Sequence, residues 1–513
     1  MPSAVLVASA FGLAYVAHLL LNYKRMLSRI GHFPGFRMTS HPLSLLQTIN
    51  DRALGEDPLM MGKFRPFQEA GYDVISWVNW FPKAQMSWIL ADPETIKQVT
   101  SDRTRFEKPV EVYESICLYG SNIVASEGDE WKRHRKITAP AFSENNNRLV
   151  WDETAHIVDD LLNDVWGNAS EVTVKDAVDF TIPIAIFVIS AAGFGQRAKW
   201  LENRVPPPGH QMTFKDAVHT LCAELITVMS TPKWALGLNK KLRTARSSVE
   251  EMRQYMMEMI DERRYIHDGH SGADLFSLLM GALDDGDAKA TDRELTGNIF
   301  IFLLAGHETT AHTLAFALAY LALYPEAQDC LHREVETTTG GFQRELTYDD
   351  IDSLVYTNAV VYEVLRMQPP VAAIPKRCTE DTTLNVANQQ RQRVTIPVPK
   401  GTIVMLDAMG LHYNPQHWAD PHAFKPERFL GDWNREAFIP FSTGSRACIG
   451  RRFSETEAAV VLTHILTRYT VKIADDPKFA HETFEQRKER VLAYKPGMTT
   501  TPAAIPLTFV RRG

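Results

Sequence analysis

One long apolar run limits what this chain can fold into. Residues 298–324 read NIFIFLLAGHETTAHTLAFALAYLALY, which is long enough to cross a bilayer as a helix. The polar letters HETTAH stand at its middle, at 307–312, and polar groups at a bilayer centre are costly without partners. The run therefore predicts a long helix through the core of a large protein. Gly306 lets neighbouring groups approach closely and can permit a local opening of the helix.

The rest of the sequence predicts one large, mainly α-helical domain with small β-sheets. Helical periodicity dominates from about residue 125 to 370, and short β-like segments stand at 74–80, 392–398 and 402–407. With 513 residues and a hydrophobic share of 45%, the chain can bury a large core. The formal net charge of -7 argues against a nucleic-acid binder, which usually carries a basic surplus.

The N-terminal segment predicts a membrane anchor. Residues 4–21 are uncharged, and basic residues follow them directly at 24–29, so the positive-inside rule places the rest of the chain in the cytosol. The alternative is a cleaved signal peptide, but a charged region before the apolar segment is missing, and the five scattered cysteines indicate a reduced compartment without disulfides. We therefore expect an anchor over residues 1–30 and a single large domain over residues 31–513.

The stretch at 307–312 is similar to the zinc motif H-E-x-x-H, but its spacing is different. That motif places two histidines four residues apart on one helix face. His307 and His312 are five residues apart, so they point in directions too different to share one ion. Glu308 and Thr309 form instead an adjacent acid–alcohol pair, which can relay protons to a group bound beside the helix. A capped or kinked core helix is the alternative.

A second polar pair stands on a helix that ends at Pro369 and Pro370. Glu363 and Arg366 are three residues apart, and such a pair on a surface would be a weak, solvated bridge. Their neighbours are valine and leucine, so the pattern predicts a buried, bidentate pair that needs further partners. Arg428, in FKPERFL, is a candidate partner.

Cys448 lies between Gly444 and Gly450, two residues after Arg446, where a helix-like segment begins. Small and polar residues mark turns, and a buried cysteine is often only a small hydrophobic residue. The alternative is a metal ligand, because helix N-terminal N–H groups stabilise a thiolate. The residue types at this position leave both interpretations open.

The motifs follow one another in a characteristic order. They are W-x-x-x-R at Trp131 and Arg135, AGHETT at 305–310, E-x-x-R at 363–366, PERF at 426–429, and F-x-x-G-x-R-x-C-x-G from Phe441 to Gly450. Together they resemble the cytochrome P450 family of haem-thiolate monooxygenases, from about residue 31 to the end. The N-terminal segment resembles the anchor of the eukaryotic microsomal members.

The resemblance implies the cytochrome P450 fold: mainly α with small β-sheets (α+β), as a single large catalytic domain behind an N-terminal transmembrane helix. It also implies haem b as cofactor. Cys448 would be the axial thiolate ligand of the haem iron, and Phe441 would shield its sulfur from water. Gly444 and Gly450 would let the backbone approach the porphyrin. Arg446 would pair with a haem propionate.

The same resemblance gives roles to two other groups of residues near the haem. Trp131 and Arg135 would contact the propionates, with an amphipathic surface helix as the alternative. In IPKRC (374–378), either Lys376 or Arg377 would also contact a propionate, and Arg377 is the more usual residue type.

On the long helix, the oxygen-activating stretch would comprise Ala305, Gly306, Glu308 and Thr309. Thr309 would hydrogen-bond dioxygen, and Glu308 would help to deliver protons through water. Behind the haem, a structural triad would comprise Glu363, Arg366 and Arg428.

The implied reaction inserts one oxygen atom of O2 into a hydrophobic small molecule, such as a terpenoid, fatty-acyl or aromatic secondary metabolite. We expect an apolar pocket lined by Ile116, Leu118, Ile123, Phe302, Val371, Ala372, Ala373 and Ile374. Alternatives are a haem-thiolate isomerase or dehydratase that needs no reductase, and a haem-binding sensor without turnover.

The implied partners are an electron donor and a membrane. We expect NADPH-cytochrome P450 reductase, with cytochrome b5 as a second candidate, at the endoplasmic reticulum membrane, with a single-pass anchor in the lipid and the catalytic domain in the cytosol. An acidic flavoprotein would meet basic residues on the thiolate side, although ordinary solvated charge is the alternative. These residues are Lys132, Arg133, Lys136, Arg451 and Arg452.

Overall fold

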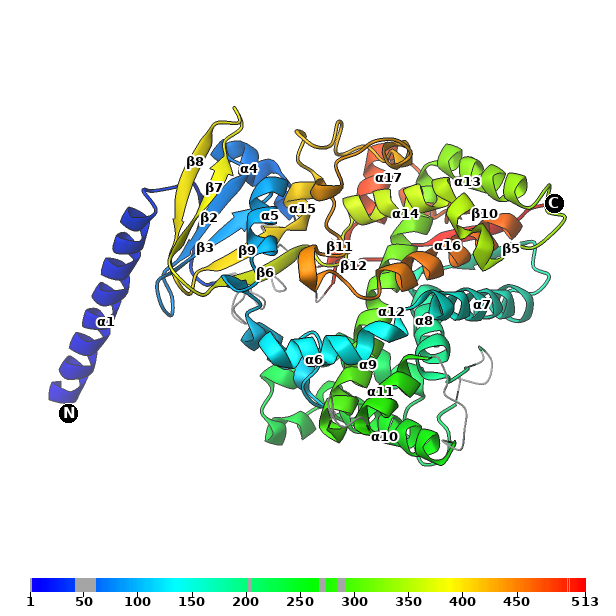
Figure 1. The fold of residues 1–513 in the computed structure, drawn as a ribbon, viewed down its shortest axis with the longest axis horizontal. Coiled ribbons are helices and arrows are strands. Elements are labelled where there is room, and N and C mark those ends of the chain that lie inside the picture. Colours follow the sequence, from blue (N-terminus) through cyan, green and yellow to red (C-terminus); the bar gives the residue numbers. More distant parts are fainter. Residues whose placement is uncertain are drawn as a thin grey trace.

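The structure is a computed structural model that describes residues 2–41, 61–198, 200, 205–266, 274–284, 291–495, 497 and 499–513. Long helices form most of it, and the strands are short (Figure 1). The predicted class, mainly α with small sheets, is therefore confirmed.

Thirteen strands are present among the described residues. Their bounds are β1 (Gly35–Met38), β2 (Val74–Asn79), β3 (Gln85–Leu90), β4 (Phe106–Glu107), β5 (Glu171–Val174), β6 (Ala373–Cys378), β7 (Thr382–Ala387), β8 (Arg393–Val398), β9 (Ile403–Asp407), β10 (Tyr469–Ile473), β11 (Tyr494–Lys495), β12 (Thr501–Pro502) and β13 (Leu507–Arg511). Strands β2, β3, β6, β7, β8 and β9 lie toward the N-terminal helix, whereas β5 and β10 lie at the opposite end, near the C-terminus (Figure 1). The three predicted β segments correspond to β2, β8 and β9.

The largest sheet has six strands in the order β1-β2-β3-β9-β6-β4. The pairs β1–β2 and β3–β9 are parallel and the other pairs are antiparallel. Strands β2 and β9 are buried along their whole length, as is typical of strands covered on both faces. This sheet fixes β6, which carries Ile374 into the wall of a large cavity. The smaller sheets are β10-β13-β5, β11-β12 and β7-β8.

The α-helices surround one central helix. Their bounds are α1 (Pro2–Arg29), α4 (Arg65–Ala70), α5 (Pro93–Ser101), α6 (Gly128–Thr138), α7 (Glu144–Asp160), α8 (Val178–Val188), α9 (Phe214–Ser230), α10 (Lys240–Ile266), α11 (Leu275–Asp284), α12 (Asp292–Leu323), α13 (Pro325–Thr338), α14 (Val355–Met367), α15 (Ala408–His412), α16 (Arg451–Arg468) and α17 (Phe484–Val491). Helix α12 packs against α8, α14 and α16.

Helix α12 contains most of the long apolar run at 298–324. Among the described residues, it is the one helix long and apolar enough to span a membrane, and 78% of its most apolar window is buried inside the protein. The predicted core helix is therefore confirmed. It is continuous through Gly306, and a Cβ at that position would lie 3.0 Å from the Ile189 side chain. Gly306 thus serves close packing, and the helix does not open there.

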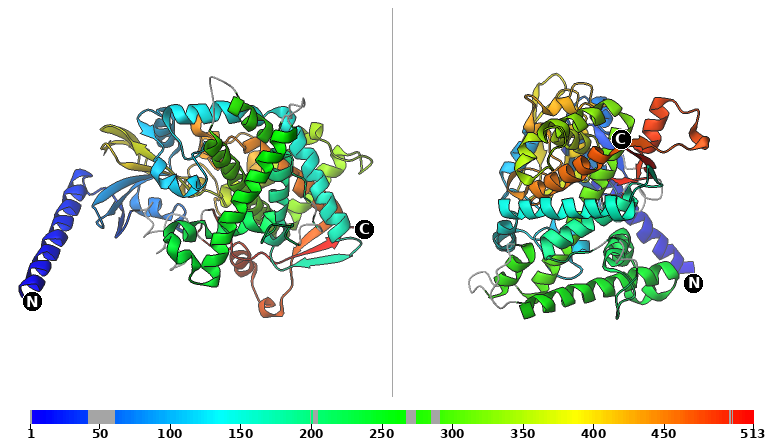
Figure 2. Two further views of the ribbon diagram at one scale, coloured as in Figure 1. Left: turned by 90° about the horizontal axis from the view of Figure 1, so that it is seen from below. Right: turned by 90° about the vertical axis from the view of Figure 1, so that its right-hand side faces the viewer.

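Helix α1 extends away from the rest of the chain (Figures 1 and 2). Leu6, Phe11 and Leu13 are all exposed by 70% or more. Helix α1 also touches β2 and β3, and the Tyr15 hydroxyl donates to the Pro82 carbonyl at 3.0 Å. An apolar helix that projects from the body fits the predicted anchor, which stays a prediction.

Candidate functional site

The cysteine loop is held in shape by its own backbone. The Cys448 N–H donates to the Phe441 carbonyl at 2.8 Å, and α16 begins three residues after Cys448. Gly444 has a φ of +72°, and a Cβ there would lie 2.8 Å from the Thr100 carbonyl of α5. Only glycine fits both the left-handed backbone and the close approach to Thr100, so contacts within the protein are enough to explain Gly444.

A cavity lies between this loop and the middle of α12, and Cys448 and Thr309 both line it. It holds about 1440 Å³ of space free of protein atoms, with open solvent at its mouth included. Much of its wall is apolar, and among the residues expected there, Ile123, Phe302, Val371 and Ile374 line it. Ile116, Leu118, Ala372 and Ala373 are not among the lining residues.

Cys448 faces this cavity rather than bulk solvent. The residue lies deep in the protein, and the exposed part of its surface borders the cavity. Burial raises the pKa of the Cys448 thiol, whereas a hydrogen bond from the Gly450 backbone and the charges of Arg135 and Arg451 lower it. These three groups favour the thiolate, which is the form that binds a metal.

Positive charge collects at one side of the cavity. Arg446 donates to the Glu127 carboxylate at 2.7 Å and to the Ser126 carbonyl at 2.8 Å, and its guanidinium lies 4.0 Å from the centre of the Trp131 ring. Lys108 also lines the cavity, and burial together with the charges of Arg446 and Lys376 lowers its pKa to about 7.

The charge of these cations can be compared with the charge of a haem, which carries two propionates. Burial, followed by the charge of Arg446, lowers the pKa of Lys376, whose residue surface is 6% exposed. Lys376, Arg446 and Lys108 thus lie close to one carboxylate, that of Glu127. Buried charges need partners, and the two propionates of a haem would supply them. The donor set and the charge therefore fit haem.

The structure separates the two neighbouring cations of β6. Lys376 lies beside Arg446 and Lys108, whereas Arg377 pairs with Glu111 of the 3-10 helix at Val110–Cys117. Neither Lys376 nor Arg377 is among the lining residues, whereas the predicted Trp131 and Arg135 are. Sequence reasoning missed Lys108, because a lone lysine in FEKPV matches no motif.

The acid–alcohol pair on α12 points in two directions. The Thr309 hydroxyl donates to the Ala305 carbonyl at 2.9 Å, and both residues line the cavity. Glu308 is not among the lining residues, and its carboxylate accepts a hydrogen bond from the Thr499 hydroxyl at 3.0 Å. Thr499, which follows β11, also bonds to Nδ1 of His312 at 3.0 Å. No motif in the sequence marks Thr499.

The two histidines of α12 have separate surroundings. Nδ1 of His307 bonds to the Leu303 carbonyl at 2.7 Å, whereas Nδ1 of His312 faces Thr499. Burial lowers the pKa of His307 to about 4 and that of His312 to about 3, so both rings are neutral at physiological pH. Their different partners agree with the spacing argument against a shared zinc ion.

The third predicted group lies behind the cavity on α14. Glu363 and Arg366 have side chains with 0% exposure and are joined by two hydrogen bonds of 2.7 and 2.8 Å. Arg428 donates to the same carboxylate at 3.2 Å, and the Lys425 backbone N–H donates to it at 2.9 Å. Arg366 also donates to three backbone carbonyls of the following segments, those of His412, Pro421 and Ala423. The pair is thus fully hydrogen-bonded, as a buried ion pair must be.

A family model now places the chain in a class. The model described as cytochrome P450 matches residues 64–497, so the chain belongs to the cytochrome P450 family. The family implies a haem-iron cofactor, which the donor set and the charge of the cavity fit.

Individual relatives agree with this class. The chain is 46% identical to cytochrome P450 monooxygenase 124 of Postia placenta over 96% of both chains. It is 28% identical to cyclooctat-9-en-7-ol 5-monooxygenase of Streptomyces melanosporofaciens, over 75% of this chain and 80% of that one. These relatives support an oxidoreductase of the monooxygenase type.

A solved structure shows the same fold. The haem domain of cytochrome P450DA superposes with a TM-score of 0.75 at 24% identity, over 94% of this chain and 98% of that chain. The cytochrome P450 fold is therefore confirmed for the body of the protein.

Proposed function

We propose that this cytochrome P450 inserts one oxygen atom of O2 into a hydrophobic small molecule, with haem b held by Cys448. The observation that carries the proposal is one apolar cavity with Cys448 on one side, Thr309 on α12, and Lys108 and Arg446 in its wall. The buried Lys376 lies close to these two cations. Haem b rather than a covalently attached haem is favoured because the sequence has no C-x-x-C-H motif.

Each residue of the cavity then has a task. The Cys448 thiolate would hold the iron of a bound haem, and the haem would supply the activation of dioxygen. Arg446 and Lys108, together with Trp131 and Arg135 on α6, would hold the propionates, and Lys376 would add its charge beside them.

Three further residues support this arrangement. Phe441 lines the cavity and its carbonyl accepts the Cys448 N–H, so its ring would shield the sulfur from water. Gly450 lines the cavity, and a Cβ there would come no closer than 3.7 Å to another part of the protein, the Phe142 ring. Packing within the protein therefore does not require glycine, and we assign this position to the approach of the haem. Arg377, which pairs with Glu111, supports β6 from its other side.

Protons reach the cavity through the acid–alcohol pair. The Thr309 hydroxyl donates to Ala305 at rest and can turn its proton toward a ligand in the cavity. Glu308 stores a proton or gives it up at its carboxylate, while Thr499 orients that group. The structural triad of Glu363, Arg366 and Arg428 stabilises the protein behind the haem and takes no part in proton transfer.

The substrate is hydrophobic because the cavity wall is largely apolar. We propose a terpenoid, fatty-acyl or aromatic secondary metabolite. The name of the Streptomyces relative gives a cyclic alcohol, cyclooctat-9-en-7-ol, as the molecule on which that protein acts, which supports a hydrophobic substrate for this chain.

Electrons come from NADPH-cytochrome P450 reductase, with cytochrome b5 as a second donor. The basic face proposed for docking carries less free charge than its residue types indicate. Four of its five residues pair with carboxylates: Lys132 with Asp129, Arg133 with Glu294, Arg451 with Glu455, and Arg452 with Asp352. Docking must therefore draw on Lys136 and on rearrangement of exposed pairs.

The location follows from α1. We propose that residues 1–30 anchor the protein in the endoplasmic reticulum membrane by one span and that residues 31–513 form the catalytic domain on the cytosolic side. The exposed apolar side chains of α1 and the basic residues at its end support this arrangement.

The test is a carbon monoxide difference spectrum of the reduced protein, followed by NADPH and O2 consumption with the reductase. We expect the red-shifted Soret band of a thiolate haem, its loss in C448S, and consumption of NADPH that depends on O2. A haem-thiolate isomerase or dehydratase would give the band but turn over a hydroperoxide without reductase. A haem-binding sensor would give no turnover.

A further inference from the structure

The loop between the 3-10 helix at Val110–Cys117 and α6 forms one wall of the cavity. Ile123 and Val124 of this loop line the cavity, and the loop crosses the first turns of α12. Gly297 of α12 permits the crossing, because a Cβ there would overlap the Ser121 carbonyl. The position of this wall is therefore set by contacts with α12.

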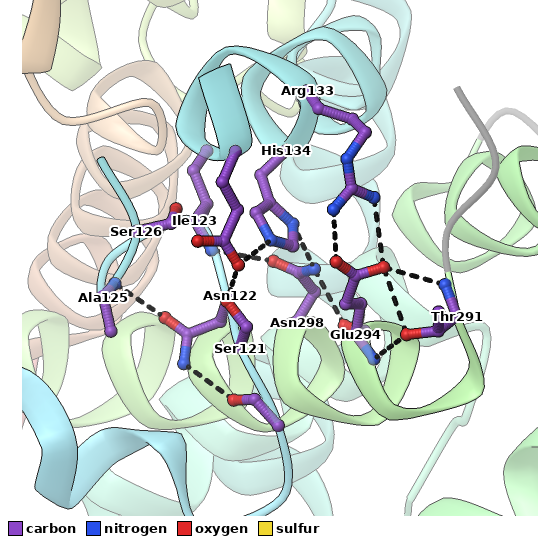
Figure 3. Close-up of polar contacts among 12 residues, drawn as sticks. Ser121, Asn122, Ile123, Ala125, Ser126, Arg133, His134, Thr291, Glu294 and Asn298 are labelled. Carbon is purple, nitrogen blue, oxygen red and sulfur yellow. Dashed lines mark hydrogen bonds and ion pairs between the residues drawn. The ribbon is translucent and has the colours of Figure 1, made fainter. Parts of the chain in front are cut away.

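One side chain of α12 holds the loop at the point where it meets the cavity (Figure 3). Oδ1 of Asn298 accepts a hydrogen bond from the Ile123 backbone N–H at 3.0 Å. Nδ2 of Asn298 donates to Nδ1 of His134 at 2.9 Å and to the Glu294 carbonyl at 2.8 Å. Asn298 is 3% exposed, so water does not compete for these bonds.

The bonding pattern fixes the proton on His134. A backbone N–H can only donate, so the amide oxygen of Asn298 must face Ile123 and its nitrogen must face His134. Nδ1 of His134 is then an acceptor, and the one proton of the neutral ring lies on Nε2. Burial lowers the pKa of His134, which keeps the ring neutral, and the charged groups that face it are Glu130, Arg133 and Glu294.

This assignment decides between two uses of the cluster. The ligand atoms of Glu130, His134 and Glu294 lie within 4.8 Å of one another, as in a metal site. Nε2 of His134 carries a proton, however, so it has no lone pair to offer. The Glu294 carboxylate is also taken by two hydrogen bonds from Arg133, one of them 3.0 Å long. The cluster therefore joins α6 to α12.

We propose that Asn298, oriented by His134, is a specificity-determining positioning residue. It fixes Ile123 in the wall of the cavity, next to Val124, whose N–H is held by Asn122 of the same loop, and so sets which hydrophobic molecules fit. The inference rests on the proposed function, because it assumes that haem and substrate share this cavity. A wall that is ordered before binding costs the ligand less entropy than one that must be ordered by it.

The first experiment measures the wall directly by hydrogen exchange of the full-length holoenzyme. In N298A the Ile123 amide loses its acceptor, and we expect exchange in residues 121–126 to be about fivefold faster, as for one lost hydrogen bond. The matched control is T296A, since Thr296 bonds to the Tyr119 carbonyl at 3.2 Å and leaves Ile123 alone. Equal exchange in N298A and T296A would overturn the proposal.

The second experiment measures ligand selection with two probes that bind haem iron through nitrogen. We expect imidazole to bind without touching the wall, whereas the phenyl group of 4-phenylimidazole has to fit beside it. In N298A we expect the affinity for 4-phenylimidazole relative to imidazole to fall about fivefold, with imidazole itself unchanged. A relative affinity that stays the same or rises would refute the positioning role.

Further variants separate this role from general damage. If Asn298 acts through Ile123, the effects of N298A and I123A on 4-phenylimidazole are not additive in the double variant. H134A should shift the relative affinity in the same direction but less, and should add nothing to N298A. If N298A fails to fold, H134A alone carries the test. A wild-type protein that gives no spectral change with imidazole would refute the haem assignment itself, whereas a normal wild-type response with an unaffected N298A would refute only the role of Asn298.

Discussion

Replacing Lys108 by methionine should change the stability of the protein in opposite directions with and without haem. Burial and the charges of Arg446 and Lys376 lower the pKa of Lys108 from 10.5 to about 7. A tenfold change in a proton equilibrium is about 1.4 kcal/mol, so burying this lysine costs the haem-free protein about 4 kcal/mol at neutral pH. K108M removes that cost.

The pH dependence predicts the direction in which the stability of the haem-free protein changes. The cost is complete below the folded pKa of about 7, where the lysine is charged in both states. This cost decreases as the pH rises from about 7 toward 10.5. Over that range Lys108 is already neutral in the folded protein, while protonation of the lysine stabilises the unfolded chain less and less. Haem-free wild-type protein should therefore gain stability over this range, and K108M should gain less.

In the holoenzyme we expect the sign to reverse, because a propionate would then be the partner of Lys108. We expect K108M to lose haem about tenfold faster, as for a lost hydrogen bond between charged groups. The assays are urea unfolding of haem-extracted protein and transfer of haem to apomyoglobin. K132M is the matched control, since Lys132 is 54% exposed and pairs with Asp129 at the surface. An unchanged haem transfer rate would refute the propionate role, and a less stable haem-free K108M would refute the burial argument.

Three other perturbations test other parts of the site. T309A should keep its haem but divert NADPH consumption into hydrogen peroxide, measured with the reductase; unchanged coupling would contradict the proton-transfer role. E363A should lower the free energy of unfolding by about 3 to 5 kcal/mol, seen as an earlier urea midpoint, because Arg366 is left buried without its partner; the double variant E363A/R366M should regain part of this loss. Deletion of residues 1–30 should release a soluble, haem-loaded protein, and continued tight binding to membranes would point to further membrane contacts.

Features that depend on local pattern were predictable from the sequence. The apolar run at 298–324 with polar groups at its centre identified α12, because no other setting satisfies both sets of residues. The valines and leucines around Glu363 and Arg366 predicted a buried pair, and both side chains have 0% exposure. The spacing of His307 and His312 excluded a shared ion, and the two rings have different partners.

Contacts between distant segments were not predictable in the same way. Lys108, Asn298 and Thr499 stand at positions that no motif marks, and each takes part in the site through residues far away in the sequence. Their positions depend on how loops cross helices, which depends on packing rather than on periodicity. The contact that requires glycine at position 444 was likewise not predictable, because its partner, Thr100, lies in a helix far away in the sequence.

The two adjacent cations of β6 show how register decides a role that residue type cannot. Successive side chains of a strand point to opposite faces of the sheet, so Lys376 and Arg377 cannot face the same side. Pairing of Lys376 with Val404 of β9, next to Arg377 with Ile403, sets which face each one takes. Lys376 then lies beside Arg446, and Arg377 meets Glu111. Strand register therefore places the less usual residue type, Lys376, on the side of Arg446, and for that reason we propose it rather than Arg377 as the propionate partner.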